Sequence, residues 1–345
     1  MRIGIAFDLK AGPTSAATDP IPNAADGADR RLPDDFQEEF DSPATIEAVS
    51  NALRSLGHDV VLLGDGRELI LKVLQQPPDL VFNFAEGHGV GRSREARVPA
   101  VLEMLGIPYT GSDPLTLAAT LDKDCAKRLV TSAGVHVPRG VVIAPNDNAS
   151  EACRRADLRF PVIVKPAWEG SSKGIRGTSL VDRQPNLAGV VRDLGLDHRQ
   201  PVLIEEFIDG DELTVGVLGN DPPRILGVMR VLPVETGQPF VYSLEVKRDY
   251  ERQVRYECPA RLSATSMEAV RKAALMVYHV LGCRDVARID FRMRGDTPCF
   301  LEVNPLPGLH PVSSDLVIMA QLCGWSHAQL IHTILQAAVQ RHGLS

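Results

Sequence analysis

The chain has 345 residues, which at roughly 150 residues per domain predicts two or three domains. Hydrophobic residues make up 44% and charged residues 23%, which is ordinary for a globular protein and leaves ample material for a core. The net charge of −7 argues against a general nucleic-acid binder, which needs a basic surface to neutralise phosphates. No apolar run approaches the roughly 20 residues of a membrane-spanning helix, so no membrane partner is expected.

The start of the chain and its cysteines bear on the compartment. The opening residues, M-R-I-G-I-A-F-D-L-K, enter an apolar segment directly and lack the regions of an export signal. The six cysteines are scattered and form no C-x-x-C pair, which is typical of reduced thiols. We therefore expect a cytoplasmic protein.

The first part of the chain alternates apolar strands with helical periodicity. Strands are expected at 3–7, 59–63 and 80–84, and helices at 43–57 and 98–105. This alternation predicts a parallel sheet covered by helices, in an α/β domain over residues 1–111. Residues 10–43 hold eight acidic and three basic residues and five prolines, and we expect them to form a long surface loop.

The remainder of the chain favours two α+β domains, at 112–208 and 209–345. Their expected helices are 121–133, 266–281 and 325–340. Their expected strands are 140–143, 161–165, 178–181, 202–207, 213–218 and 224–231, followed by a hairpin at 286–304.

The hairpin at 286–304 is the most informative segment. Its expected turn is centred on Asp296, so symmetric pairing sets Asp290 directly opposite Glu302. The neighbouring pair on the same face joins Arg288 to Asn304. Carboxylate and amide oxygens beside an arginine suit Mg²⁺ bound together with a phosphate.

The alternative for this hairpin is a solvated sheet face with a cross-strand pair between arginine and a carboxylate. Two like charges opposite each other are unfavourable without a cation, which favours the metal. The other face should be buried, because it carries Ile289, Phe291, Leu301 and Val303.

Two further segments have features of a nucleotide site. The loop W-E-G-S-S-K-G-I-R-G at 168–177 offers backbone N–H groups to an anion, although it is no Walker A loop. The alternative is a glycine-rich hairpin loop without a ligand. The strand ending at 205–208 offers carboxylates and backbone groups at a hinge between two domains, and the alternative is a plain strand with exposed acids.

Together these segments resemble the ATP-grasp superfamily and, within it, the D-alanine–D-alanine ligase family. The resemblance runs from about Ile107 to the C-terminus, through I-P-Y-T-G-S, L-D-K-D-C-A-K, P-V-I-V-K-P-A-W-E-G-S-S-K-G, V-L-I-E-E-F, Y-S-L-E-V-K, E-C-P-A, R-I-D-F and F-L-E-V-N-P-L-P-G. It implies an ATP-grasp fold and an ATP-dependent carbon–nitrogen ligase, which forms an amide bond through an acyl phosphate and releases ADP and phosphate. It also implies ATP and Mg²⁺ as cofactors, with Mn²⁺ as the alternative cation, and a homodimer that acts on small amino acids or amines.

The resemblance also implies roles for individual residues. Those that would hold ATP are Lys123, Lys165, Gly170, Ser171, Ser172, Glu205, Glu206, Phe207, Ile208 and Glu212. Those that would hold the metal are Asp290, Glu302 and Asn304. Arg288 and the backbone of Gly308 would stabilise an oxyanion, Lys247 belongs to the substrate loop, and Ser313 would bind the acceptor carboxylate.

The amino-acid pockets depart from the family pattern. The family's first loop carries a glutamate that grips the donor amino group, and here only Glu47 or Glu39 could replace it. The segment 86–95 reads E-G-H-G-V-G-R-S-R-E in place of H-G-x-x-G-E-D-G, which makes Glu86 a candidate substrate residue. Arg248 stands where the family has a tyrosine, and is a further candidate. Two alternatives therefore stay open: the same ligation of a non-alanine substrate, and a nucleotide-binding protein without turnover.

Overall fold

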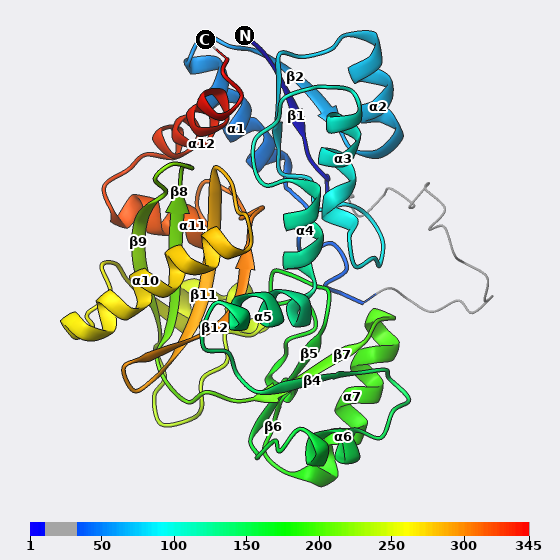
Figure 1. Ribbon diagram of the computed structural model, residues 1–345, viewed down its shortest axis with the longest axis vertical. Coiled ribbons are helices and arrows are strands. Elements are labelled where there is room, and N and C mark those ends of the chain that lie inside the picture. Colours follow the sequence, from blue (N-terminus) through cyan, green and yellow to red (C-terminus); the bar gives the residue numbers. More distant parts are fainter. Residues whose placement is uncertain (11–32, 345) are drawn as a thin grey trace.

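Three sheets follow one another along the chain. The computed structural model describes residues 1–10 and 33–344. These residues form a three-stranded, a four-stranded and a five-stranded sheet. In Figure 1 the three-stranded sheet lies at the top, beside both termini, and the other two sheets lie below it. No helix within the described ranges is long and apolar enough to cross a membrane.

The three-stranded sheet is parallel, with the order β2–β1–β3, as the alternation of strands and helices predicts. Helix α1 begins at Pro43 because the Ser42 side chain accepts a hydrogen bond from the Thr45 N–H. Helix α2 was not predicted, and it buries only Leu69 and Val73. The elements of this part are β1 (Arg2–Ala6), α1 (Pro43–Ser55), β2 (Asp59–Gly64), α2 (Gly66–Gln75), β3 (Leu80–Asn83), the 3₁₀ helix η1 (Arg94–Ala96) and α3 (Arg97–Met104).

The acidic segment 10–43 differs from the expected surface loop. Residues 11–32 lie outside the described residues. The part from 33 to 40 coils into consecutive turns, and Asp35, Glu39 and Phe40 are buried. The expectation is wrong for this part because charged side chains such as Asp35 and Glu39, together with the Phe40 ring packed against His88, hold it against the rest of the protein.

The four-stranded sheet is antiparallel, with the order β4–β7–β5–β6. The helix expected at 121–133 is observed as α5, whose start is capped by the Asp122 side chain through the Cys125 N–H, whereas α4, which ends just before Asp122, was not predicted. Helices α6 and α7 pack on one face of this sheet. The elements are α4 (Pro114–Leu121), α5 (Lys123–Ser132), β4 (Gly140–Ile143), α6 (Ala149–Arg155), β5 (Val162–Pro166), the 3₁₀ helix η2 (Gly177–Ser179), β6 (Leu180–Val181), α7 (Gln184–His198) and β7 (Val202–Glu206).

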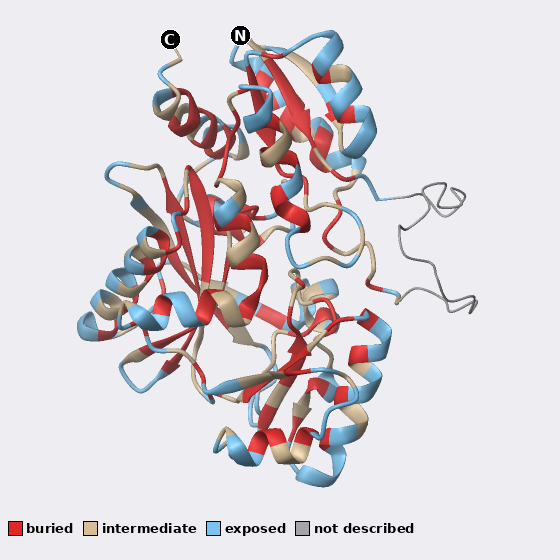
Figure 2. Ribbon diagram, turned by 45° about the vertical axis from the view of Figure 1, so that its right-hand side comes forward, coloured by how far each residue is buried: buried red, intermediate tan, exposed pale blue. Residues whose placement is uncertain are grey.

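The five-stranded sheet is antiparallel, with the order β10–β9–β8–β11–β12. Apolar residues of α5 and α10 cover one of its faces. Figure 2 shows the central strands β8 and β11 mostly buried and the outer side of α10 exposed. The elements are β8 (Glu212–Leu218), β9 (Arg224–Pro233), α8 (Leu244–Arg248), α9 (Tyr250–Gln253), β10 (Val254–Glu257), α10 (Ala264–Val280), β11 (Val286–Arg294), β12 (Thr297–Asn304), α11 (Asp315–Leu322) and α12 (His327–Arg341).

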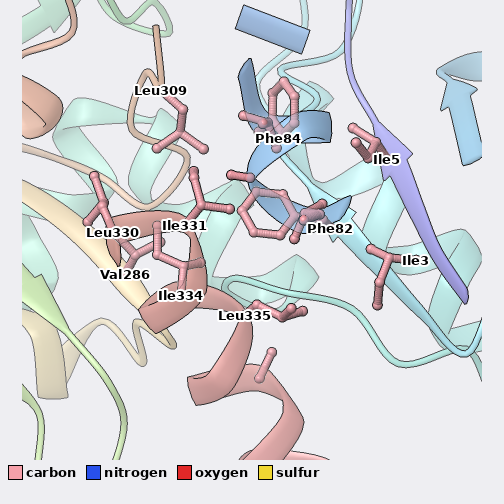
Figure 3. Packing of buried hydrophobic residues seen from close by; sticks show 14 of the residues in the cluster. Ile3, Ile5, Phe82, Phe84, Val286, Leu309, Leu330, Ile331, Ile334 and Leu335 are labelled. Atoms are coloured by element: carbon pink, nitrogen blue, oxygen red, sulfur yellow. The ribbon is translucent and has the colours of Figure 1, made fainter. Parts of the chain in front are cut away.

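One core joins the two ends of the chain. The C-terminal helix α12 packs against α1 and the three-stranded sheet, so the last helix completes the core of the first domain. Figure 3 shows the Phe82 ring of β3 beside Ile331 and Ile334 of α12. This packing fixes the three-stranded sheet relative to the five-stranded sheet, because Val286 and Leu218 of the latter belong to the same core.

We expect replacement of Phe82 by alanine to lower the free energy of unfolding by about 3–5 kcal/mol, since it leaves a cavity in this shared core. Chemical denaturation followed by circular dichroism measures the loss. Leu74, which is 60% exposed on α2, provides the control, and Leu74→Ala should cost about 0.5 kcal/mol or less. Equal losses in the two variants would contradict the assignment of this core.

Candidate active site

A cleft of about 720 Å³ lies between the four-stranded and five-stranded sheets. Its walls come from β5 and β7 on one side and from β8, β11 and β12 on the other. Many of the residues selected from the sequence line this cleft: Lys165, Ser172, Glu205, Glu206, Phe207, Ile208, Glu212, Lys247, Arg288, Asp290 and Glu302.

A second cavity, of about 570 Å³, adjoins the first. Arg288 and Glu302 line both, so the two spaces meet at the polar face of the β11–β12 hairpin. Of the residues selected from the sequence, the second cavity also brings together Glu86, Lys123, Gly170, Ser171, Asn304 and Gly308.

The β11–β12 hairpin has the expected pairing but a different turn. Asp290 pairs with Glu302, and Arg288 pairs with Asn304. The turn consists of Gly295 and Asp296 and is therefore centred half a residue before Asp296, because Arg294 pairs with Thr297. A β-bulge between Asp290 and Phe291 restores the expected register.

The bulge corrects the expected position of one apolar residue. Ile289, Phe291 and Val303 are buried on the core face, as expected. Leu301 is the extra residue of the bulge and lines the cleft beside the polar groups. Sequence symmetry could not reveal this, because a bulge changes which face a residue occupies.

The two carboxyl groups on the polar face of the hairpin, Asp290 and Glu302, differ in how strongly nearby cations stabilise their ionised forms. Arg288 donates to the Asp290 carboxylate from Nη2 at 3.0 Å and from Nε at 3.2 Å, and the Thr214 hydroxyl donates to it at 2.9 Å. Burial nevertheless raises the pKa of Asp290, and the charge of Glu302 adds to this effect. Burial opposes the ionisation of Glu302 as well, but Lys123, Lys165 and Arg288 hold its pKa well below the ordinary value. A carboxyl with a raised pKa beside an ionised one fits a face that accommodates an additional cation.

The two lysines selected for ATP phosphates occupy different positions. The Lys123 ammonium lies 3.1 Å from Glu302 and donates to the Glu169 carbonyl. The Lys165 ammonium pairs with Glu205, which also binds Lys127. Burial is the main cause that lowers the pKa of Lys127, to about 8. Lys127 was not selected from the sequence, although it stands one helical turn after Lys123.

The acids at the end of β7 and the start of β8 are held in ion pairs, and Glu205 is buried, unlike the exposed acids of the alternative interpretation. Glu205 is held by the two lysines, and Glu206 lies 2.7 Å from the Arg294 guanidinium. Glu212 binds Arg292, whose guanidinium also stacks 4.7 Å from the centre of the Phe207 ring. The cleft wall at this hinge is therefore a preorganised set of ion pairs around an aromatic ring.

The loop after β5 folds against the acidic segment. Ser171 and Ser172 have positive φ angles of 49° and 59°, which turn the loop sharply. The Gly170 N–H donates to Glu39 at 2.5 Å, and the Ser172 hydroxyl donates to the Tyr242 carbonyl at 3.0 Å. A side chain at position 170 would meet Glu39 Oε1 at 2.9 Å, so this contact requires glycine.

A buried charge cluster anchors Glu39. Its carboxylate lies 2.7 Å from Arg94 and 3.0 Å from Lys173, and Glu169 binds the same two cations. Burial opposes its ionisation, but Arg94 and Lys173 hold the pKa of Glu39 at about 2. Glu47, the other candidate for this position, is exposed on α1 and does not line the second cavity as the described residues form it.

The remaining candidates lie at the edge of the site. Lys247 lines the cleft, 3.9 Å from Asp315 and over the Tyr242 ring. Arg248 binds Asp34 at 2.9 Å and Glu38 at 2.8 Å, which ties α8 to the acidic segment. Ser313 is exposed, and its hydroxyl lies 2.9 Å from His310 Nδ1. Arg248 and Ser313 are not among the residues that line either cavity within the described ranges.

Several lining residues were missed in the sequence because their partners are distant along the chain. Asp315 is buried at the start of α11, 3.5 Å from Arg288. Glu95 lines the second cavity from η1. The only available signal for Glu95 was its place at the end of the segment 86–95, which departs from the family pattern.

The comparisons with known proteins agree with this geometry. Residues 129–336 match the family model described as D-ala D-ala ligase C-terminus. The chain is 33% identical, over 299 residues, to a D-alanine–D-alanine ligase of Desulforudis audaxviator, covering 85% of this chain and 92% of the relative.

Solved structures show the same fold. The D-alanine–D-alanine ligase from Bacillus anthracis complexed with ATP is similar with a TM-score of 0.72 and 21% identity, covering 99% of both chains. The VanG D-Ala:D-Ser ligase from Enterococcus faecalis is similar with a TM-score of 0.69 and 22% identity, covering 98% of this chain and 99% of that chain. The expected ATP-grasp fold is thereby confirmed.

We expect Glu39→Gln to lower the free energy of unfolding by about 3–5 kcal/mol at pH 7, because it leaves Arg94 and Lys173 short of a buried partner. The pKa of Glu39 is about 2 in the folded protein and ordinarily 4.5, so its ionised form stabilises the fold fully above pH 4.5 and loses this effect towards pH 2. The gap between variant and parent should therefore narrow from pH 5 to pH 3 in denaturation experiments. The exposed Glu47→Gln is the matched control, and a loss as large as that of Glu39→Gln would contradict the prediction.

Proposed function

The chain belongs to the D-alanine–D-alanine ligase family, and from this premise we propose that it joins the carboxylate of one small amino acid to the amine of another molecule through an acyl phosphate. It is an ATP-grasp enzyme, and its activity is ATP-dependent amide-bond ligation. The observation that carries the proposal is that Arg288 and Glu302 line both cavities. A phosphoryl group held in the first cavity is then adjacent to a carboxylate held in the second.

The first step activates the carboxylate. A carboxylate oxygen attacks the γ-phosphorus of ATP, the bond from that phosphorus to the β,γ-bridging oxygen breaks, and ADP leaves. Lys123 and Lys165 are proposed to offset the negative charge of the transferring group, since Lys165 lines the first cleft and Lys123 lines the adjoining cavity. We propose Asp290, Glu302 and Asn304 as the ligands of Mg²⁺, with Mn²⁺ as the alternative, and the bound ion would neutralise phosphate charge.

The second step forms the amide. The amine nitrogen attacks the carbonyl carbon of the acyl phosphate, and inorganic phosphate departs with the bonding electron pair. Arg288 and the Gly308 N–H are the groups proposed to stabilise the oxyanion, and each such donor is worth roughly 3 kcal/mol. Gly308 suits this role because it lines the second cavity together with Arg288.

Water must be kept from the acyl phosphate. The loop at 168–177 contacts the acidic segment through Gly170 and contacts Tyr242 through Ser172. Arg248 bonds the acidic segment on the outer side. These contacts support a role for the loop, the acidic segment and α8 in closing the site.

Two alternatives differ in their support. The same ligation with a non-alanine substrate is favoured by Glu86 and Glu95 in the second cavity. A nucleotide-binding protein without turnover has the weaker support, because Lys123, Glu302 and Arg288 form one charged face around the junction of the two cavities.

We further propose domains at 1–111, 112–208 and 209–345, a homodimer, and a cytoplasmic location.

The decisive experiment measures ADP release from ATP and Mg²⁺ with a panel of D- and L-amino acids, singly and in pairs. Turnover that requires a carboxylate and an amine together supports the proposal. Strong turnover with D-alanine alone would reject the non-alanine alternative, and binding of ATP without ADP release for any pair would favour the protein without turnover.

We expect Glu302→Ala to reduce ADP release at least about 100-fold, because it removes a proposed metal ligand and the partner of Lys123. Circular dichroism should show an intact fold, since Glu302 lies on the polar face. Asp193→Ala, at an exposed position on α7, is the control and should retain the parental rate. A parental rate in Glu302→Ala would remove Glu302 from the site.

A further inference from the structure

The second cavity has a wall of carboxylates. Glu86 follows β3, Glu95 lies in η1, and both line the cavity together with Glu39. Glu95 is 7% exposed and shares a hydrogen bond with Glu86, and neither carboxyl forms an ion pair with a basic residue within the described ranges. Such a wall is costly to bury unless positive charge faces it.

The basic residues near this wall are already engaged. Arg94 and Lys173 form ion pairs with Glu39 and Glu169, at distances from 2.6 to 3.2 Å. No Lys, Arg or His among residues 1–10 and 33–344 has a nitrogen within 4.0 Å of the Glu86 or Glu95 carboxylate. The cluster around Glu39 is therefore balanced, whereas the hydrogen-bonded pair of Glu86 and Glu95 has no ion pair of its own within the described ranges.

The pKa values of the Glu86 and Glu95 carboxyl groups agree with the lack of an ion pair to a basic side chain. Burial raises the pKa of Glu86 well above its ordinary value, and Glu95 adds to the effect. Burial also raises the pKa of Glu95 to about 7, although Arg94 opposes this. A ligand cation between the two carboxylates would favour their ionised forms.

Other groups of the same cavity suit the carboxylate of an amino acid. Lys123 and Arg288 line the cavity, and Arg288 also lines the first cleft. Apolar side chains of Leu121 and Leu306 line the same cavity and can contact methylene groups. The cavity thus combines cationic, apolar and anionic groups.

We propose that the second cavity binds a diamino carboxylic acid, whose two ammonium groups contact Glu86 and Glu95 and whose carboxylate points towards Lys123 and Arg288. This rests on the proposed ligase function and specifies its carboxylate substrate. An amino acid with a single ammonium group supplies one positive charge to the two carboxylates and a diamino acid supplies two, so alanine is the poorer substrate in this proposal. Glu39 does not take this role, because Gly170, Arg94 and Lys173 already occupy its oxygens.

The test uses hydroxylamine as the amine, which makes the assay independent of the natural acceptor. Hydroxylamine nitrogen attacks the acyl phosphate, phosphate leaves, and a hydroxamate forms that the ferric assay detects. The carboxylates compared are alanine, 2,3-diaminopropionate, 2,4-diaminobutyrate and ornithine, each in D and L form. We expect at least one diamino acid to exceed alanine of the same configuration at least tenfold in kcat/KM, and alanine equal to or better than every diamino acid would overturn the proposal.

Two variants test whether Glu86 and Glu95 cause the preference for a diamino acid over alanine. Glu86→Gln and Glu95→Gln should each lower the ratio of diamino acid to alanine kcat/KM at least fivefold. Glu68→Gln, the same change at a side chain 68% exposed on α2, should leave the ratio unchanged. An unchanged ratio in both wall variants would overturn the assignment of Glu86 and Glu95.

A binding experiment separates this inference from the proposed function. Calorimetry with the parent protein, Mg²⁺ and a non-hydrolysable ATP analogue measures the Kd of each amino acid without turnover. Tighter binding of a diamino acid than of alanine supports the inference even if no carboxylate gives hydroxamate or ADP, an outcome that would reject the proposed ligation alone. Equal or weaker binding of every diamino acid would overturn the inference even if ligation proceeds.

Discussion

The opposition of Asp290 and Glu302 across the β11–β12 hairpin is the constraint on which the site depends. Two carboxylates on adjacent strands repel each other, so the face is stable only with cations around it. Arg288 binds the first and Lys123 the second, and Arg288 and Glu302 line both the cleft and the second cavity. The charge that stabilises the fold here is the same charge that the proposed phosphoryl transfer requires.

The order and type of most elements follow from local patterns in the sequence. Apolar alternation predicts the strands, and capping residues such as Ser42 set helix starts. The pairing of Asp290 with Glu302 follows from symmetry about the expected turn. The observed turn shifts the strand register relative to that expectation, and the bulge shifts it back. Helix α2 was missed because its buried stripe has only two residues, and Leu301 was misplaced because a bulge leaves no local signal.

The residues of the candidate site also fall into two groups, those with a local signal in the sequence and those without one. Residues in contiguous motifs, such as Lys165 and Glu302, were selected because the strand or loop that presents them is visible in the sequence. Glu39 could only be narrowed to one of two candidates, because its partners lie 55 residues away at Arg94 and 131 residues away at Gly170. Long-range ion pairs depend on the assembled fold, and a single sequence contains no pattern for them.

The position of α12 has a consequence for biosynthesis. Strands β1, β2 and β3 are synthesised well before α12, so the part of their core that α12 covers stays open until that helix has been made. The middle of the chain can complete its own sheet earlier, because α6 and α7 are local to it. Nascent chains of this protein should therefore need protection from aggregation at the three-stranded sheet, and loss of α12 would leave that core permanently open.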